Sequence, residues 1–274
     1  NPFYLGKKFN FNKATTEVDE LINDPEISAV IISTRHDSHC DLICKSLEAS
    51  KHVFVEKPLC LNTQELNSIK STCENNKNNI LMVGFNRRFS PLISALKKNL
   101  NSITGPKAFV YTCNAGALSA NHWIQDPLIG GGRLIGEACH FVDILRFLVG
   151  SAIEDVSLTT MLDPNYCSDT FSLELKFADG SMGSVHYLSN GSNSFPKERL
   201  EVFASGKVFC LDNYRKLRAW GVPGFITKRS FVQDKGQYLC ARSFLRALGN
   251  GEDRPIPLEE LFEVQDWLNK ILGV

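Results

Sequence analysis

The chain has 274 residues, of which 43% are hydrophobic and 22% charged, and its 30 basic residues equal its 30 acidic ones. This length exceeds what one hydrophobic core usually serves, so we expect two domains. Because the charge is balanced and no apolar run approaches the ~20 residues of a membrane span, we expect neither a nucleic-acid nor a membrane partner.

The nine cysteines are scattered, and none forms a C-x-x-C pair. An odd, unpaired set is typical of a reduced protein in which cysteines act as small buried apolar groups. No secretory signal pattern and no methionine open the chain, so we expect a cytoplasmic protein whose first residues are a cut edge. Residues 1–11 show neither a helix cap nor periodicity, and no element is predicted there.

The first third of the chain alternates short apolar runs with helical patterns. The runs lie at 28–32, 52–55 and 80–84, and helices are predicted at 17–23, at 38–50 and from residue 62 or 63. Runs without polar alternation are typical of strands that are buried on both faces of a parallel sheet. Helices between such strands indicate β-α-β crossovers, so residues 1–88 are predicted to form a doubly wound, parallel α/β sheet.

Residues 89–274 follow a different pattern. Helices are predicted at 91–100, 134–149, 238–248 and 258–272, and strands at 107–114, 155–161, 171–177, 181–188, 199–204, 207–211 and 214–220. Alternation is clearest at 171–177, and a tight turn over residues 178–180 links this strand to the next. We therefore expect an α+β domain with a large, mostly antiparallel open sheet, arranged as a meander.

Glu56, Lys57 and Pro58 directly follow the second predicted strand. In doubly wound sheets, ligands bind at the carboxyl ends of the strands, so Lys57 is placed to face a crevice. Pro58 ends the strand and fixes its exit. The alternative is a surface salt bridge followed by a turn proline, because lysine is rarely buried unless it is paired.

Three glycines at 130–132 precede Glu137 and His140. Glycine lets the backbone approach a ligand closely. Glu137 and His140 are three residues apart, so a helix places them on one face, and Asp143 follows three residues later. A histidine oriented by a carboxylate is the arrangement that a general base needs near neutral pH. The alternative is a capped helix whose histidine is fully hydrogen-bonded within the fold.

Ser33, Thr34, His36 and His39 follow the first predicted strand. Hydroxyl and amide groups at a strand end and a helix N-terminus suit a phosphate or a ribose. A metal site made of these histidines and the nearby cysteines fits no zinc spacing, so we expect no metal.

Two further segments are candidates for ligand contacts. Asn86 and Arg87, followed by a second arginine, lie where the last α/β strand passes into the second domain. Two arginines there can hold an anionic or polyhydroxyl ligand, or they can stabilise a hinge through salt bridges. His122, Trp123 and Asp126 belong to a polar-aromatic loop in which Trp123 either stacks on a sugar or anchors the loop.

Taken in order, four segments resemble the Gfo/Idh/MocA oxidoreductases, the family of glucose–fructose oxidoreductase and inositol dehydrogenase. The segments are 29–34 with His39, then 51–58, 84–91 and the triple glycine leading to His140. The match covers nearly all of the chain. In detail it looks most like a branch in which this module follows a zinc-alcohol-dehydrogenase-like domain, in proteins often linked to surface polysaccharide synthesis.

The resemblance implies an NAD- or NADP-dependent dehydrogenase that acts on a secondary alcohol of a sugar, a nucleotide-sugar or a cyclitol. Lys57, His140 and Glu137 would be catalytic, with Lys57 and His140 on opposite walls of one cleft. The same lysine and histidine, with His122, Trp123 and Asp126, would contact the polyhydroxyl substrate. The cofactor would lie against Ser33, Thr34, His36, His39, Glu56, Lys57, Pro58, Asn86 and Arg87.

Two departures from the family pattern bear on this interpretation. The family opens with a strand, a glycine-rich turn and a helix that hold the pyrophosphate, and no such unit is found in these 274 residues. We therefore expect a partial Rossmann domain, and weak or no activity of this chain by itself. Gly136 stands where many relatives carry an aspartate four residues before the histidine, so Glu137 is the nearest acid that can take its place.

Two other functions fit the same residues. One is a non-catalytic sugar-binding or assembly module with a degenerate Rossmann part, and the other is an NAD-dependent glycosidase, which the family also contains. An antiparallel sheet with a free face favours self-association, so we expect a homo-oligomer that forms through the C-terminal sheet.

Overall fold

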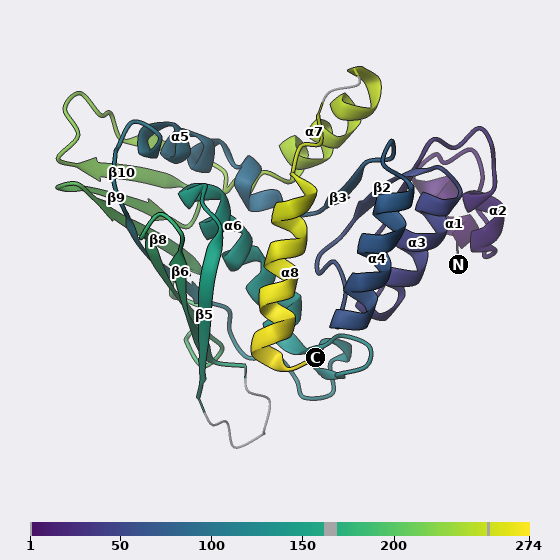
Figure 1. Cartoon of the computed structure of the whole chain (residues 1–274), viewed down its shortest axis with the longest axis horizontal. Helices are drawn as coiled ribbons and strands as arrows, with labels where there is room; N and C mark the ends of the chain where they lie inside the picture. Colours follow the sequence, from purple (N-terminus) through teal and green to yellow (C-terminus); the bar gives the residue numbers. More distant parts are fainter. Residues whose placement is uncertain (1, 162–168, 251–252) are drawn as a thin grey trace.

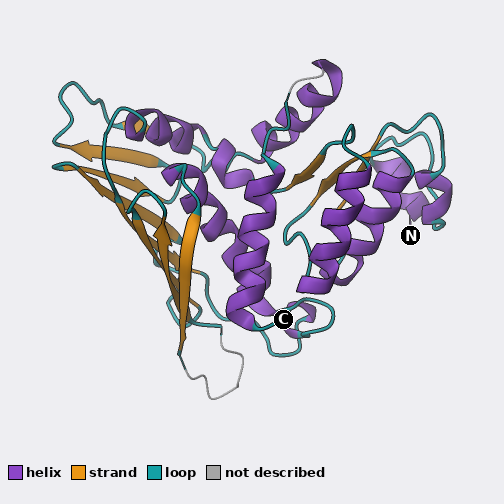
Figure 2. Cartoon of the chain, viewed as in Figure 1, coloured by secondary structure: helices purple, strands orange, loops and turns teal. Residues whose placement is uncertain are grey.

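The computed structural model describes residues 2–161, 169–250 and 253–274. Two β-sheets lie apart, with helices between them (Figure 1). The smaller sheet is built from the first third of the chain and the larger one from the rest, as the two groups of strands in Figure 2 show. Both fold classes that the sequence predicts are therefore present.

The smaller sheet contains three parallel strands in the order β1-β2-β3. They are β1 (Ala29–Ile32), β2 (His52–Val55) and β3 (Leu81–Val83), and they are joined by the helices α3 (His39–Glu48) and α4 (Thr63–Asn75). All of β3 and most of β2 are buried, which explains why these runs lack polar alternation. The predicted parallel α/β arrangement is confirmed.

Two short helices precede this sheet, α1 (Pro2–Lys8) and α2 (Val18–Ile22). Because the sequence predicts no element over residues 1–11, α1 corrects that expectation. Most side chains of α1 are exposed, so it has no apolar stripe by which periodicity could reveal it. Lys7 and Lys8 lie in its last turn, where positive charge interacts favourably with the helix dipole.

The larger sheet has eight strands in the order β11-β10-β9-β8-β4-β7-β6-β5. They are β4 (Ala108–Asn114), β5 (Ile153–Thr160), β6 (Phe171–Phe177), β7 (Met182–Leu188), β8 (Glu198–Ala204), β9 (Lys207–Asp212), β10 (Lys216–Trp220) and β11 (Lys228–Arg229). All neighbouring pairs except one are antiparallel.

The exception overturns the predicted meander. Strand β4 lies between β7 and β8, and it pairs with β7 in the parallel direction, with Ala108 opposite Met182. A strand buried on one face shows the same alternation in either direction, so the sequence pattern does not fix which neighbour it pairs with. The pairing of β4 with β7 is decided by contacts between segments that are far apart in the chain, such as Ala108 and Met182.

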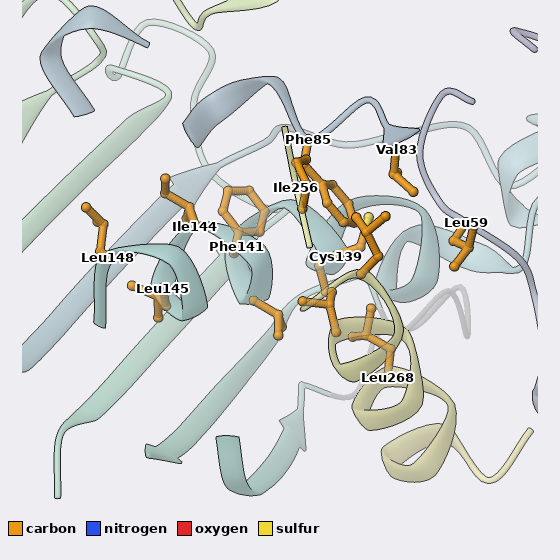
Figure 3. Packing of buried hydrophobic residues seen from close by; sticks show 14 of the residues in the cluster. Leu59, Val83, Phe85, Cys139, Phe141, Ile144, Leu145, Leu148, Ile256 and Leu268 are labelled. Atoms are coloured by element: carbon orange, nitrogen blue, oxygen red, sulfur yellow. The ribbon is translucent and has the colours of Figure 1, made fainter. Parts of the chain in front are cut away.

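Four longer helices complete the fold: α5 (Pro91–Leu100), α6 (Cys139–Val149), α7 (Gln237–Asn250) and α8 (Leu258–Leu272). Helix α8 stands between the two sheets and contacts both α4 and α6 (Figure 1). A single core cluster runs through both parts of the chain. Figure 3 shows members of this cluster from the first part, Leu59 and Val83, together with Cys139 of α6 and Leu268 of α8.

One predicted helix is divided in two. The sequence predicts one helix over 134–149, but Leu134–Ala138 forms a π-helical turn, labelled η4, before α6 begins at Cys139. Helix α6 ends as predicted, with Gly150 in the left-handed conformation at φ 79°. The π turn changes which residues share a face, so the three-residue spacing between Glu137 and His140 does not describe their geometry.

The described cysteines are free, and six of the eight are buried, as the sequence predicts. The ninth, Cys167, lies outside the described residues. None of the helices in the described ranges is both long and apolar enough to cross a bilayer.

Candidate active site

Lys57, at the end of β2, extends toward η4 in the second part of the chain. Its ammonium group donates hydrogen bonds to the backbone oxygen of Gly136, at 2.8 Å, and to a carboxylate oxygen of Glu137, at 2.7 Å. Both charged side chains stay partly accessible, at 19% for Lys57 and 24% for Glu137. The fold therefore joins two candidate catalytic residues that are 80 positions apart in the chain.

The backbone of η4 explains why the acid comes from position 137. A Cβ atom on Gly136 would lie 3.1 Å from Cε1 of His36, which is tighter than an ordinary contact. Glycine at this position lets His36 lie against the turn, and the carboxylate that reaches Lys57 comes from the next residue. That Glu137 takes the place of the aspartate implied by the resemblance stays a prediction.

Lys57 also sets the charge state of Glu137. Burial raises the pKa of Glu137, but the charge of Lys57 and its hydrogen bond outweigh burial and hold that pKa below the ordinary 4.5. Glu137 is therefore ionised at neutral pH and acts as the counter-ion that fixes the Lys57 ammonium group.

His140 lies in the first turn of α6, directly after η4, and is 6% exposed. Its Nδ1 atom is buried and has no hydrogen-bond partner in the described part of the chain. Burial lowers the pKa of His140 well below 6.5, and the positive charges of Arg87 and Lys57 lower it further. The imidazole is therefore neutral at neutral pH, which is the form that accepts a proton.

Asp143 does not orient His140, contrary to the prediction from their spacing. Its two carboxylate oxygens accept hydrogen bonds from Nε of Arg88, at 3.0 Å, and from Nη2 of Arg88, at 2.5 Å. The arginine comes from η2 (Asn86–Phe89), 55 residues earlier, so local spacing gave no sign of this competing partner. The other prediction for His140, a ring fully hydrogen-bonded within the fold, is also wrong at Nδ1.

Ser33 and Thr34 lie exposed at the carboxyl end of β1. The Thr34 hydroxyl is 2.6 Å from the hydroxyl of Ser38, close to the start of α3. These groups match the expectation of a polar strand end that is open to a ligand.

His36 and His39 lie deeper and are bonded to the protein. Nδ1 of His36 is 2.7 Å from the backbone oxygen of Gly130, and Nδ1 of His39 is 2.8 Å from the backbone oxygen of Pro58. His36 is 5% exposed and His39 is fully buried. Burial lowers the pKa of His36 to about 4, so its ring is neutral. His36 therefore joins the two parts of the chain, whereas His39 links the start of α3 to the turn after β2, and both rings are engaged with the protein.

Glu56 and Asn86 line a cavity of about 410 Å³ between the smaller sheet and α7. Phe54 and Phe244 supply apolar walls to this cavity, whereas Lys57 is not among its lining residues. The side-chain amide of Asn86 donates a hydrogen bond to the backbone oxygen of Lys235, at 2.8 Å.

Arg87 is buried and occupied by a carboxylate, so the salt-bridge alternative describes it better than a cofactor contact. Its Nε and Nη2 atoms donate hydrogen bonds to Glu198, at 3.0 and 3.1 Å. Lys235 donates to the same carboxylate at 2.5 Å, and the hydroxyl of Tyr111 donates at 2.6 Å. Burial raises the pKa of Glu198, but Arg87 and Lys235 outweigh it and lower the value to about 2.

Sequence reasoning missed Glu198 and Lys235. One signal was present for Glu198, because it stands in phase with the buried residues Leu200, Val202 and Ala204 of β8. A charged residue on the buried face of a strand requires a partner, so this phase alone pointed to a buried ion pair. Lys235 lies in a connecting segment, where the sequence pattern gave no comparable signal.

In the loop with His122 and Asp126, the ring of Trp123 packs against His36. The Trp123 ring lies 4.8 Å from the His36 ring in an edge-on arrangement, and the guanidinium carbon of Arg35 lies 5.7 Å from it. Nδ1 of His122 accepts a hydrogen bond from a backbone N–H in η3 (Trp123–Gln125), and Asp126 is exposed. These contacts favour the interpretation of Trp123 as a loop anchor.

Within the described ranges, no group of three or more histidine, cysteine, aspartate or glutamate residues is placed to hold a metal ion. The arrangement that remains is an accessible ammonium group, its carboxylate counter-ion and a neutral histidine at the junction of the two parts. Such a set can hold a polar oxygen and accept its proton.

Comparison with known families identifies both parts of the chain. Residues 5–85 match the model of an oxidoreductase family with an NAD-binding Rossmann fold, and residues 107–208 match the GFO/IDH/MocA C-terminal domain. The chain is 30% identical to the myo-inositol 2-dehydrogenase of Thermotoga maritima, over 77% of the chain and 64% of that protein. It is 35% identical to the NAD(+)-dependent scyllo-inositol 2-dehydrogenase of Bacillus subtilis, over 56% of the chain and 44% of that protein. The chain thus spans less than two thirds of the length of either relative.

Solved structures share the whole described architecture. Levoglucosan dehydrogenase, in complex with NADH and levoglucosan, aligns with a TM-score of 0.85 at 21% identity, over 99% of this chain and 84% of that one. A probable dehydrogenase from Thermotoga maritima aligns with a TM-score of 0.82 at 24% identity, over 99% and 86%. At these identities the likeness shows the fold alone. With both family models matched in order, the chain belongs to the Gfo/Idh/MocA family of oxidoreductases.

Proposed function

We propose that this chain carries the reaction centre of an NAD(P)-dependent oxidoreductase that acts on a secondary alcohol of a sugar, a nucleotide-sugar or a cyclitol. The observation that carries the proposal is the bond between Lys57 and Glu137, directly before a neutral His140 whose Nδ1 has no partner in the described residues. The names of the relatives support this substrate class, since they are dehydrogenases of inositols and of levoglucosan.

The strand ends fit one part of a dinucleotide. Ser33, Thr34 and Glu56 are exposed at the carboxyl ends of β1 and β2, and Asn86 is half-buried beside the end of β3. Polar groups at this edge suit a ribose and a nicotinamide, and these four residues would hold NAD or NADP. When bound, the nicotinamide supplies the acceptor of the hydride in oxidation and its donor in reduction. No glycine-rich turn for the pyrophosphate follows a strand in the described residues.

Lys57 and His140 divide the work on the substrate oxygen. His140 is neutral and accepts the proton of the substrate hydroxyl group. Lys57 donates a hydrogen bond to the same oxygen and stabilises the negative charge that develops on it. Glu137 keeps the ammonium group at the junction of the two parts, because its bond to Lys57 spans them.

The experiment is replacement of the base in a catalytically active, longer form of the protein. His140→Ala should lower kcat by about 10²–10⁴-fold, the usual contribution of a positioned general base. His186→Ala is the matched control, because His186 lies on β7 and is hydrogen-bonded only to Ser172 among the described residues. If His140→Ala leaves kcat unchanged, His140 takes no part in the mechanism.

The large sheet supports a proposal about assembly. Met182, Phe203 and Trp220 lie about half exposed on strands of this sheet, at 52%, 45% and 50%. We propose that this face joins two copies of the chain, because apolar side chains on an uncovered sheet favour pairing. All eight cysteines of the described residues are free, which supports a reducing location such as the cytoplasm. Sedimentation of the chain and of Phe203→Glu tests the assembly, and a wild-type monomer contradicts it.

A further inference from the structure

The ammonium group of Lys57 has three N–H bonds, and the fold uses two of them. One donates to the backbone oxygen of Gly136, at 2.8 Å, and one to the carboxylate of Glu137, at 2.7 Å. The described residues supply no further acceptor to this group. Because the three N–H bonds of an ammonium group are arranged tetrahedrally, two fixed bonds determine the direction of the third. The third N–H bond is the one that the proposed function assigns to the substrate oxygen.

The direction of that third bond therefore depends on where the Gly136 oxygen lies. Gly136 belongs to the π turn η4, and the ring of His36 packs against it: a Cβ atom on Gly136 would lie 3.1 Å from Cε1 of His36. The imidazole is 5% exposed, so it fills the space beside the turn almost completely. His36 thus contacts the residue whose oxygen Lys57 binds.

His36 is itself held from three directions. Its Nδ1 atom is 2.7 Å from the backbone oxygen of Gly130, and this atom donates the hydrogen bond because a carbonyl oxygen can only accept. The N–H of the next residue, Asp37, donates to the backbone oxygen of Ile129 at 3.1 Å. The ring of Trp123 lies edge-on to the imidazole, at 4.8 Å. These contacts leave the imidazole little freedom to move away from η4.

The acceptor of the His36 bond is also fixed in place. A Cβ atom on Gly130 would overlap the backbone of Ile124, so only glycine allows this close approach to η3. The N–H of Gly130 donates to the backbone oxygen of Asp126, at 2.8 Å. The first glycine of the 130–132 run therefore anchors His36 through the protein backbone.

We propose that His36 is a positioning residue for Lys57: it holds the π turn in place through Gly136 and so directs the third N–H bond of Lys57 toward the substrate oxygen. This inference rests on the proposed function, because it takes Lys57 as the group that binds that oxygen. It gives His36 no contact with the substrate or with the cofactor. If His36 only stabilised the fold, its loss would leave the hydrogen bonds of Lys57 unchanged.

The hydrogen bonds of Lys57 can be measured in this 274-residue chain without any turnover. Nitrogen-15 NMR detects lysine ammonium groups whose protons exchange slowly because they are hydrogen-bonded, and Lys57→Met assigns the signal. We expect a slow signal in the wild type and exchange at least about tenfold faster in His36→Ala, the effect of weakening one hydrogen bond. His36→Asn should restore slow exchange in part, because its amide nitrogen is attached at Cγ like Nδ1 and can donate to Gly130.

A histidine at the other end of the same strand provides the matched control. His52 begins β2, and its Nδ1 atom accepts a hydrogen bond from the N–H of Ile80 at 3.0 Å. His52→Ala therefore also removes a bond between a histidine and the backbone, but far along the strand from Lys57, and should leave the exchange of Lys57 unchanged. Urea unfolding of both variants separates a local change at Lys57 from a general loss of stability.

A substitution at Gly136 tests the contact from its other side. Gly136→Ala places a methyl group against the His36 ring, so it should also speed the exchange of the Lys57 protons. In His36→Ala that ring is absent, so adding Gly136→Ala should cause little further change. Residues in direct contact give such non-additive effects, whereas independent sites give additive ones.

The same variant has a defined effect on catalysis. In a catalytically active, longer form, His36→Ala should lower kcat by about ten- to a hundredfold, the usual effect of a misplaced catalytic group, and leave KM for the cofactor nearly unchanged. A raised KM for the cofactor with an unchanged kcat would mean that His36 contacts the cofactor, which overturns the inference.

Three NMR results also overturn it: no slow Lys57 signal in the wild type, equal exchange in the wild type and His36→Ala, or equal changes in His36→Ala and His52→Ala. The proposed function fails separately. If His36→Ala and Lys57→Met both leave kcat unchanged while the exchange of Lys57 responds to His36, the positioning contact stands and the catalytic role of Lys57 does not. If Lys57→Met abolishes turnover but the exchange ignores His36, the mechanism stands and the inference does not.

Discussion

Two adjacent arginines, Arg87 and Arg88, enter different buried charge networks. Arg87 binds Glu198 through two hydrogen bonds, and Lys235 shares that carboxylate. Arg88 binds Asp143 through two hydrogen bonds and Glu260 through a third, at 2.6 Å. Consecutive residues of one 3₁₀ turn thus connect η2 to β8 on one side and to α6 and α8 on the other.

The two networks differ in their balance of charge. In the Arg88 network, Arg146 joins through Glu263, at 2.6 Å, and Glu260, at 3.8 Å, so two arginines meet three carboxylates. The charge of Lys97 also acts there, since Glu260 raises its pKa against the lowering by burial. In the Arg87 network the cations are in surplus, and His140 beside it lacks a partner for Nδ1 within the described residues.

We therefore assign a structural role to the Arg88 network and a functional role to the Arg87 network. The Arg88 network pairs its charges internally and ties α6 to α8 and η2, which is what a structural contact between the two parts requires. The Arg87 network has two cations on one carboxylate, and its positive charge acts on His140, whose Nδ1 atom has no partner among the described residues. Groups with strongly shifted pKa values are concentrated at functional sites, so this asymmetry supports the proposal that the site lies beside Arg87.

The largest effect is expected when the carboxylate of the Arg87 network is neutralised. Glu198→Gln leaves Arg87 and Lys235 buried without a counter-charge, so it should lower the free energy of unfolding by about 3–5 kcal/mol. Urea unfolding at pH 7 measures this change. Glu201→Gln, on the same strand but more exposed, is the control and should stay within about 0.5 kcal/mol. If Glu198→Gln lowers the free energy of unfolding by less than about 1 kcal/mol, the carboxylate is not needed to balance the buried charges of Arg87 and Lys235.

The pH dependence of stability tests the pairing of Glu198 in a second way. The folded pKa of Glu198 is about 2 against an ordinary 4.5, so the stability it contributes is complete above pH 4.5 and is lost as the pH falls toward 2. The lowered pKa of Glu198 contributes at most about 3 kcal/mol to the free energy of unfolding. Unfolding measured from pH 5 to 2 should show a shallower loss in Glu198→Gln than in the wild type. Parallel curves would contradict the lowered pKa.

A smaller effect is expected in the Arg88 network. Asp143→Asn leaves Arg88 bound to Glu260, so one counter-charge remains and the loss should be about 1–2 kcal/mol. Burial raises the pKa of Asp143 to about 6 despite Arg88, so its ionisation opposes folding as the pH rises through that range. The loss caused by Asp143→Asn should therefore be smaller at pH 8 than that of Glu198→Gln. If Asp143→Asn is the more damaging variant, the roles of the two networks are reversed.

Local patterns in the sequence predicted the elements that depend on near neighbours. The apolar runs of β1, β2 and β3 and the alternation of β6 were visible because burial fixes residue type along a short segment. Lys57 was found because the end of a parallel strand is a known place for ligands. Its bond to Glu137 was not derivable from spacing, because it depends on how two distant parts of the chain dock.

The remaining features depend on long-range pairing. The parallel pairing of β4 with β7 and the partner of Arg87, 111 residues away, are both decided by the tertiary fold. The π turn at Leu134–Ala138 replaces the helical turn that periodicity predicts, and Glu137, whose carboxylate bonds Lys57, belongs to this turn. The pairing of His140 with Asp143 failed for the same reason, since Arg88 competes from another element.

The most direct test of the account is the titration of His140 by NMR, with its ring signal assigned from His140→Asn. We expect the pKa of His140 to lie well below 6.5 in the wild type and to be higher in Lys57→Met, which removes a positive charge that lowers it and frees Glu137. Lys176→Met, which removes an exposed lysine from β6, should leave the titration unchanged. A wild-type pKa near 6.5, or equal titrations in the wild type and Lys57→Met, would contradict the claim that Lys57 and His140 form one site.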